Sequence, residues 1–134
     1  NLEKLGFELL ADKNSKIIEQ IKNLIVELVH YKKEQLKVNL STYLSDSLKQ
    51  DYSTLSKLFS DKEGITIEHY FIAQKIEKVK ELLVYDELTL SEIAVTLNYS
   101  NVAHLSNQFK KVTGTTPTHF KIRKENTRKQ IDSL

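Results

Sequence analysis

The chain has no cysteine, one proline and three glycines among its 134 residues. Without cysteine, this segment can form neither a disulfide nor a thiolate metal site, which fits a reducing compartment such as the cytoplasm. So few helix-breaking residues favour a mostly helical chain. No apolar run approaches the roughly 18 residues that a membrane-spanning helix needs, and no signal peptide is visible.

Net charge is also small, at +2, but the charges are unevenly distributed. Residues 101–134 carry seven Lys or Arg against two acidic residues, whereas the first hundred residues carry 13 against 16. A basic end is suited to meeting phosphates, although a solvated terminal helix explains it equally well. An apolar content of 40% predicts a folded globule of one domain or two small ones. Because the chain begins at Asn1, we expect a fragment with a missing N-terminal partner domain.

The most informative feature present is an internal repeat, because residues 40–72 recur without a gap at residues 90–122. The matched pairs are Leu40/Leu90, Ser41/Ser91, Leu55/Leu105, Ser56/Ser106, Phe59/Phe109, Gly64/Gly114, Thr66/Thr116, His69/His119 and Ile72/Ile122. Each copy has the pattern of a short helix, a tight turn, a second helix ending at glycine, and the start of a third. A helix-turn-helix unit that occurs twice predicts two recognition helices for one DNA duplex.

Apolar spacing predicts an all-α fold of about seven helices, with two homeodomain-like subdomains joined by a long linker helix. Gly6 is expected to end a short helix, and Asn14 or Ser15 to begin the next, whose apolar stripe runs from Ile17 to Val29. Asp51 is expected to cap a helix over 52–62, and Val112 to be buried beside Leu105 and Phe109. The other predicted helices span 40–49, 66–84, a segment from Thr89 or Ser91, a segment from Ser100 or Asn101 to Thr113, and one from Thr116.

These predictions divide the chain into five parts. The expected divisions are a linker or tail of a missing domain (1–13), a first subdomain (14–65), a linker helix (66–85), a second subdomain (86–127) and a C-terminal tail (128–134). Residues 32–38 are read as the end of one helix and a linker, and residues 85–87 as a break. A linker helix over 66–84 would span about 28 Å, close to the roughly 34 Å of one DNA turn.

The buried faces predict which side chains point outward. If Leu105 and Phe109 are buried, the exposed side of their helix carries Asn101, Val102, Ala103, Ser106, Asn107 and Lys110. The same logic exposes Tyr52, Ser53, Ser56, Lys57 and Ser60 in the first unit. Asn can bond adenine, Ser can bond either purine, and Val or Ala can touch a thymine methyl group.

Residues 90–121 closely resemble the second half of the AraC-type DNA-binding domain. The matching motifs are Ile93-Ala94, Tyr99, Phe109-Lys110-Lys111, Gly114 and Pro117. Residues 40–84 resemble the first half less strongly, through Leu55-Ser56, Leu58-Phe59, Gly64 and Lys75-Ile76. The chain departs from the family pattern at Leu44, where a small residue is usual, at Asn98 for the turn glycine, at Leu105 for an aromatic residue and at Lys75 for arginine.

The resemblance implies a bacterial, cytoplasmic transcription regulator that binds double-stranded DNA and usually has a separate sensing or dimerising domain. RNA polymerase is a further candidate partner, and a dimer through the missing N-terminal domain a further expectation. The base-contacting candidates are Ser53, Ser56, Lys57, Asn101, Val102, Ala103, Ser106 and Asn107. The phosphate-contacting candidates are Tyr52, Lys110, Lys111 and Thr116.

Two alternatives remain from the residues themselves. A helical protein–protein module fits the low net charge and the scarcity of Arg, which occurs only at positions 123 and 128. A nonspecific architectural DNA binder would show salt-dependent binding with little base preference. No catalytic set or phosphate loop stands out, so neither an enzyme nor a cofactor is expected. The four histidines, at positions 30, 69, 104 and 119, have no ligand-type spacing, so no metal site is expected.

Overall fold

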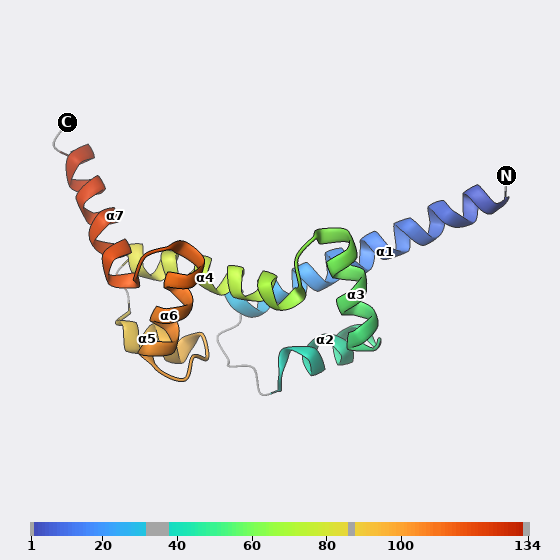
Figure 1. Ribbon diagram of the computed structural model, residues 1–134, viewed down its shortest axis with the longest axis horizontal. Helices are drawn as coiled ribbons and strands as arrows, with labels where there is room; N and C mark the ends of the chain where they lie inside the picture. The colour runs from blue at the N-terminus through green and yellow to red at the C-terminus, as the bar shows by residue number, and fades with distance from the viewer. Residues whose placement is uncertain (1, 32–37, 86–87, 133–134) are drawn as a thin grey trace. The chain divides into compact units, whose positions relative to one another are not determined.

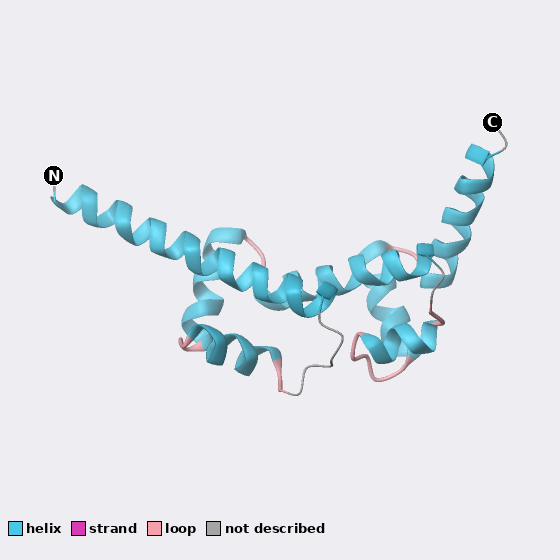
Figure 2. Cartoon of the chain, turned by 180° about the vertical axis from the view of Figure 1, so that it is seen from behind, coloured by secondary structure: helices cyan, strands magenta, loops and turns pink. Residues whose placement is uncertain are grey.

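The computed structural model describes the backbone of residues 2–31, 38–85 and 88–132, and the side chains of residues 11–31, 38–85 and 88–127. These ranges contain helices and turns and no strand, as Figures 1 and 2 show, so the predicted all-α class is confirmed. The elements are α1 (Leu2–Val26), the π-helical turn η1 (Glu27–Tyr31), α2 (Leu40–Leu48), α3 (Tyr52–Glu63), α4 (Ile67–Tyr85), α5 (Leu90–Thr96), α6 (Val102–Thr113) and α7 (Pro117–Asp132). None of the described helices combines the length and apolarity needed to cross a membrane.

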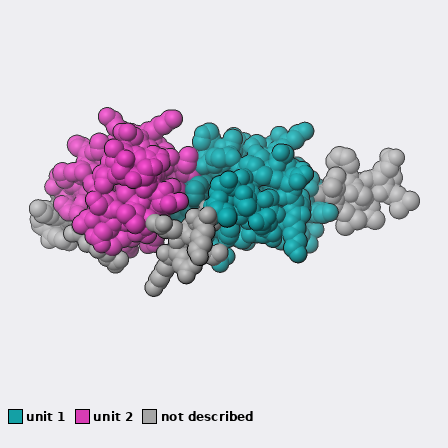
Figure 3. Space-filling view, turned by 90° about the horizontal axis from the view of Figure 1, so that it is seen from below, with its two compact units in different colours: residues 1–71 teal, residues 72–134 magenta. Residues whose placement is uncertain are grey.

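The chain divides into two compact units, residues 1–71 and 72–134 (Figure 3). The boundary falls inside α4, so this helix contributes residues to both cores. Its first residue, Ile67, is buried in the core of unit 1. Further along, Ile76 and Val79 are buried in the core of unit 2.

The core of unit 1 forms where α1 packs on a helix-turn-helix. The expected apolar stripe is present, since Ile21 and Ile25 are fully buried and Ile18 and Val29 nearly so. The rest of this core is Leu44, Leu55, Phe59 and Ile67. Fully burying each such side chain stabilises the fold by about 1.5–3 kcal/mol.

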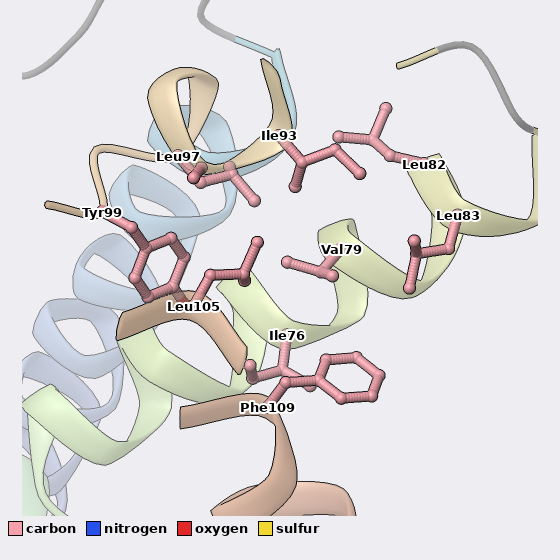
Figure 4. Close-up of a cluster of buried hydrophobic side chains, with 10 residues drawn as sticks. Ile76, Val79, Leu82, Leu83, Ile93, Leu97, Tyr99, Leu105 and Phe109 are labelled. Carbon is pink, nitrogen blue, oxygen red and sulfur yellow. The ribbon is translucent and has the colours of Figure 1, made fainter. Parts of the chain in front are cut away.

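The core of unit 2 repeats this arrangement with α4 in the place of α1 (Figure 4). Ile76 and Val79 of α4 pack with Ile93 of α5 and with Leu105 and Phe109 of α6. Ile93 and Ala94 of α5, and Leu97 just after it, are all buried.

The fifty-residue repeat is preserved in three dimensions. Gly64 and Gly114 end α3 and α6 with φ of 76° and 88°, a left-handed conformation that glycine adopts without strain. The ring pairs are equivalent, with centroids 5.7 Å apart in Phe59–Tyr70 and 5.6 Å apart in Phe109–Phe120. Thr66 and Thr116 cap α4 and α7, accepting bonds from backbone amides at 3.1 and 3.2 Å.

Several local predictions are wrong. Helix α1 runs through Gly6 without a break, and no helix begins at Asn14 or Ser15. A single glycine costs a helix only about 1 kcal/mol, too little to end it when the residues on both sides favour helix. Asp51 occupies the N-cap position of α3 but makes no side-chain cap bond. Val112 is 50% exposed rather than buried.

The turns between the paired helices differ. Asn98, which stands where the family pattern has a turn glycine, adopts a left-handed φ of 62°, a conformation that Asn tolerates better than most residues. In unit 1 the left-handed residue is Lys49, at φ 54°. Most of the predicted linker (residues 32–37) and two residues of the predicted break (86–87) lie outside the described residues, as do the side chains of the predicted tail (128–134).

Candidate nucleic-acid interface

Helix α6 presents one polar face. Leu105 and Phe109 are fully buried against α4 and α5 and fix the rotation of the helix. Ala103, Asn107 and Lys110 are exposed, and their spacing of four and three residues places them on one face. The predicted readers Val102 and Ser106 are half-buried at the edges of this face.

The N-terminus of α6 is held by contacts that the sequence did not reveal. The Tyr99 hydroxyl donates to Oε1 of Gln108 at 2.5 Å, and the Tyr99 ring packs edge-on against His104 with centroids 5.0 Å apart. The Lys75 Nζ lies 3.9 Å from the centroid of the Tyr99 ring. Because Lys75 belongs to α4, these contacts link α4 to the start of α6.

Burial shifts the pKa values of Tyr99 and Lys75 in the directions that favour their neutral forms. It raises the pKa of Tyr99 to about 12, so this hydroxyl remains a donor at neutral pH. It lowers the pKa of Lys75 from 10.5 to about 8, so Lys75 still carries its charge at neutral pH. The face of the Tyr99 ring favours that charge and opposes part of the desolvation.

Asn101 has a structural task besides the predicted base contact. It is the N-cap of α6, and its Oδ1 accepts a bond from the backbone amide of His104 at 2.8 Å. A bidentate contact to adenine needs both the oxygen and the amide nitrogen. With the oxygen in the cap, Asn101 offers its nitrogen alone as a donor.

The phosphate candidates of unit 2 are accessible. Lys110 and Lys111 are exposed in the last turn of α6. Thr116 is exposed at the start of α7, where its Oγ1 accepts the bond from the His119 amide, and Pro117 behind it is fully buried. Pro117 is the first residue of α7, a position that proline tolerates.

Unit 1 places its candidates differently. Ser53 and Lys57 are exposed on α3, and Ser56 is half-buried. Tyr52 is half-buried, and its hydroxyl donates to Oε1 of Glu68. Burial and this bond raise the pKa of Tyr52, and the same bond lowers the pKa of Glu68. The Tyr52 donor is thus engaged by a carboxylate rather than open to a phosphate.

The two reading helices also differ in charge at equivalent positions. Lys110 and Lys111 of α6 correspond to Ser60 and Asp61 of α3. Helix α6 contains no acidic residue, whereas α3 balances two lysines with Asp61 and Glu63. Attraction to DNA phosphates is therefore stronger at α6.

The described side chains bring together no group of three or more His, Asp or Glu residues that could hold a metal ion. His69 and His119 occupy equivalent places in the first turns of α4 and α7, where their amides bond the capping threonines. His104 occupies the first turn of α6, where its Nδ1 accepts a bond from the amide of Ser100 at 3.4 Å. These three histidines take part in local helix-end geometry.

The chain is similar to known helix-turn-helix proteins. A family model described as "Helix-turn-helix domain" matches residues 44–123. The xylose operon regulatory protein of Escherichia coli K12 is 26% identical over 98 residues, covering 72% of this chain and 25% of that protein. The chain thus spans about a quarter of the length of this curated relative.

Solved structures show the same fold. The C-terminal domain of the two-component response regulator yesN from Fusobacterium nucleatum is 31% identical, with a TM-score of 0.64 over 77% of this chain and 95% of that one. The DNA-binding domain of AdpA, a global transcriptional factor solved in complex with a target DNA, is 18% identical. Its TM-score is 0.70 over 84% of this chain and 96% of that one.

Proposed function

Because the chain belongs to the AraC-type helix-turn-helix family of transcription regulators, we propose that it reads double-stranded DNA through α3 and α6. The observation that carries this proposal is the exposed polar face of α6, held at a fixed rotation by Leu105 and Phe109. Ala103 is suited to a thymine methyl group, and Asn107 to adenine. Lys110 and Lys111 are suited to the phosphates on either side.

The remaining base readers complete this proposal. On α6 and its N-cap they are Asn101, Val102 and Ser106, and on α3 they are Ser53, Ser56 and Lys57. Thr116, at the start of α7, would receive a phosphate on the backbone amides of that helix. Tyr52 would contact a phosphate only after giving up its bond to Glu68.

Helix α4 supports a two-headed reading. Its 19 residues correspond to about 28 Å at 1.5 Å per residue, close to the roughly 34 Å of one DNA turn. Helices α3 and α6, flanking such a connector in sequence, would enter consecutive segments of the major groove. The neighbour solved in complex with its target DNA supports binding by this fold.

We also propose properties of the whole regulator that contains this domain. The xylose operon regulator is about four times as long as the matched region, which supports a longer protein with a separate sensing or dimerising domain. RNA polymerase would be contacted during regulation, and the site of action would be the bacterial cytoplasm, where the DNA lies. A catalytic role has no support among the relatives, which are transcription regulators.

Selection from a random duplex library against this chain, at about 150 mM salt, tests the proposal. The expected result is an enriched motif with two boxes about one helical turn apart. Salt-sensitive binding without enrichment would favour an architectural binder. An absence of binding even at low salt would favour the protein–protein module and contradict the proposal.

A further inference from the structure

Unit 2 has a hollow of about 360 Å³ where α4, the end of α6 and the first half of α7 meet. Val112 and Phe120 give it an apolar surface, and Lys80, Arg123 and Lys124 give it positive charge. The Lys124 Nζ lies 5.6 Å from the centroid of the Phe120 ring. The hollow therefore combines apolar contact with a positive charge that the proposed DNA contacts do not use.

The hollow lies away from the proposed reading face. At 100° per residue, Val112 points about 140° from Asn107 and about 180° from Ala103 around the axis of α6. Val112 is nevertheless in phase with Leu105, seven residues earlier, and so has the position of a core residue. A core-facing valine that is 50% exposed marks an apolar surface still open to a partner.

Unit 1 contains the equivalent place, and there it is occupied. Lys22 follows buried Ile21 in α1, as Lys80 follows buried Val79 in α4. The end of α3 contributes Glu63, whose Oε1 lies 2.8 Å from the Lys22 Nζ. This carboxylate is 29% exposed, and its bond raises the pKa of Lys22. Unit 1 thus supplies a half-buried carboxylate to its own lysine.

Unit 2 lacks this carboxylate. The residue equivalent to Glu63 is Thr113, whose hydroxyl donates to the backbone oxygen of Phe109 at 2.8 Å. Lys80 pairs instead with Glu77 of its own helix at 3.0 Å, and that carboxylate is 61% exposed. Among the described residues, no ion pair involves the neighbouring Arg123.

We propose that this hollow binds an acidic, apolar segment of a protein partner. An Asp or Glu of the segment takes the place that Glu63 fills in unit 1, between Lys80 and Arg123, and a neighbouring aliphatic side chain covers Val112 and Phe120. A DNA phosphate would satisfy the cations but leave the apolar surface uncovered. Because the hollow and the reading face lie on opposite sides of α6, the partner and DNA bind together.

The test is fluorescence anisotropy of the 134-residue chain with a labelled ten-residue peptide that alternates Glu and Leu. Thr113→Glu places a carboxylate where unit 1 has one, so it should weaken peptide binding at least about tenfold, or about 1.4 kcal/mol. Ser91→Glu adds the same charge to the exposed surface of α5, outside the hollow, and should weaken binding no more than about twofold. Arg123→Ala should weaken binding without adding a carboxylate.

A second peptide with Gln in place of Glu separates the two parts of the site, and it should bind at least about tenfold more weakly. The helical circular dichroism of each variant shows whether it is folded. The inference is overturned if the Glu–Leu peptide does not bind, or if Thr113→Glu and Ser91→Glu act equally. Neither result depends on duplex binding, so this inference can fail without affecting the proposed function, and the proposed function can fail without affecting this inference.

Discussion

Asn101 gives the sharpest prediction, because one side chain is assigned to both the stability of α6 and the reading of DNA. Its Oδ1 accepts from the His104 amide at 2.8 Å. Asp51, the equivalent residue of unit 1, makes no such bond. Losing a working N-cap costs about 1 kcal/mol, so Asn101→Ala should destabilise unit 2 by about that much. Asp51→Ala should change the stability of unit 1 by a few tenths of a kcal/mol at most.

Amide hydrogen exchange measures this effect at the bond itself. A loss of about 1 kcal/mol corresponds to roughly a fivefold fall in protection, and the His104 amide also loses its acceptor, so it should exchange at least about five times faster in Asn101→Ala. The equivalent amide in unit 1, that of Thr54, should be unchanged in Asp51→Ala. Equal effects of the two substitutions would refute the capping argument.

Asn101→Asp separates stability from reading. It keeps the acceptor, so the protection of the His104 amide should be retained or increased near the positive end of the helix. It removes the amide donor and adds a negative charge beside the phosphates, so binding to the selected duplex should weaken by about 1–3 kcal/mol. Unchanged duplex affinity would show that Asn101 acts as a cap alone.

Three further predictions concern reading, titration and packing. Asn107→Ala should weaken binding to the selected duplex by about 1–3 kcal/mol and alter base preference, whereas Lys111→Ala should weaken all duplexes alike and reduce the salt slope by about one. The pKa of Lys75 falls from 10.5 to about 8 on folding, so its charged form is disfavoured in the native state. Urea unfolding should therefore show stability rising as pH increases from about 8 to 10, and Lys75→Met should remove this rise. Leu44 is fully buried, so Leu44→Ala should lower the free energy of unfolding by about 2–5 kcal/mol, measured in urea.

Each of these predictions has an outcome that contradicts it. Equal, sequence-independent losses for the Asn107 and Lys111 variants would remove Asn107 from the readers. If the free energy of unfolding depends on pH in the same way in Lys75→Met, Lys75 is not desolvated by folding. A loss below about 1 kcal/mol for Leu44→Ala would mean that the surrounding side chains collapse onto the smaller residue.

The elements that depend on neighbours in sequence were predictable. The second helix of each unit was placed within about a residue, because its start and its glycine stop are set by local hydrogen bonds and local backbone conformation. The buried faces followed from helical spacing at Leu55, Phe59, Leu105 and Phe109. The family resemblance rested in part on Leu55, Phe59 and Phe109, and the family match confirms it.

The misses have different physical causes. The break predicted at Gly6 gave too much weight to a local penalty of about 1 kcal/mol, whereas the exposure of Val112 depends on what its helix meets across the fold. Val112 has the phase of a core residue, but it is half exposed and lines a hollow with residues of α4 and α7. Asp51 is a residue type that commonly caps helices, but here its side chain makes no N-cap hydrogen bond. Sequence spacing describes a residue's angle on its helix, whereas exposure and partners depend on the helices that pack against it.

The sequence by itself therefore determined the helices, the repeat and the family, because local propensity, apolar spacing and turn residues act over a few positions. Tertiary structure alone decided which side chains pair. It joined Lys75 of α4 to Tyr99 before α6, and it bonded the Tyr52 hydroxyl to Glu68. It also placed Thr113 in unit 2 where unit 1 has a paired Glu63. Residues as far apart in sequence as Lys22 and Glu63 meet only when the helices that carry them pack, and that packing depends on the whole core.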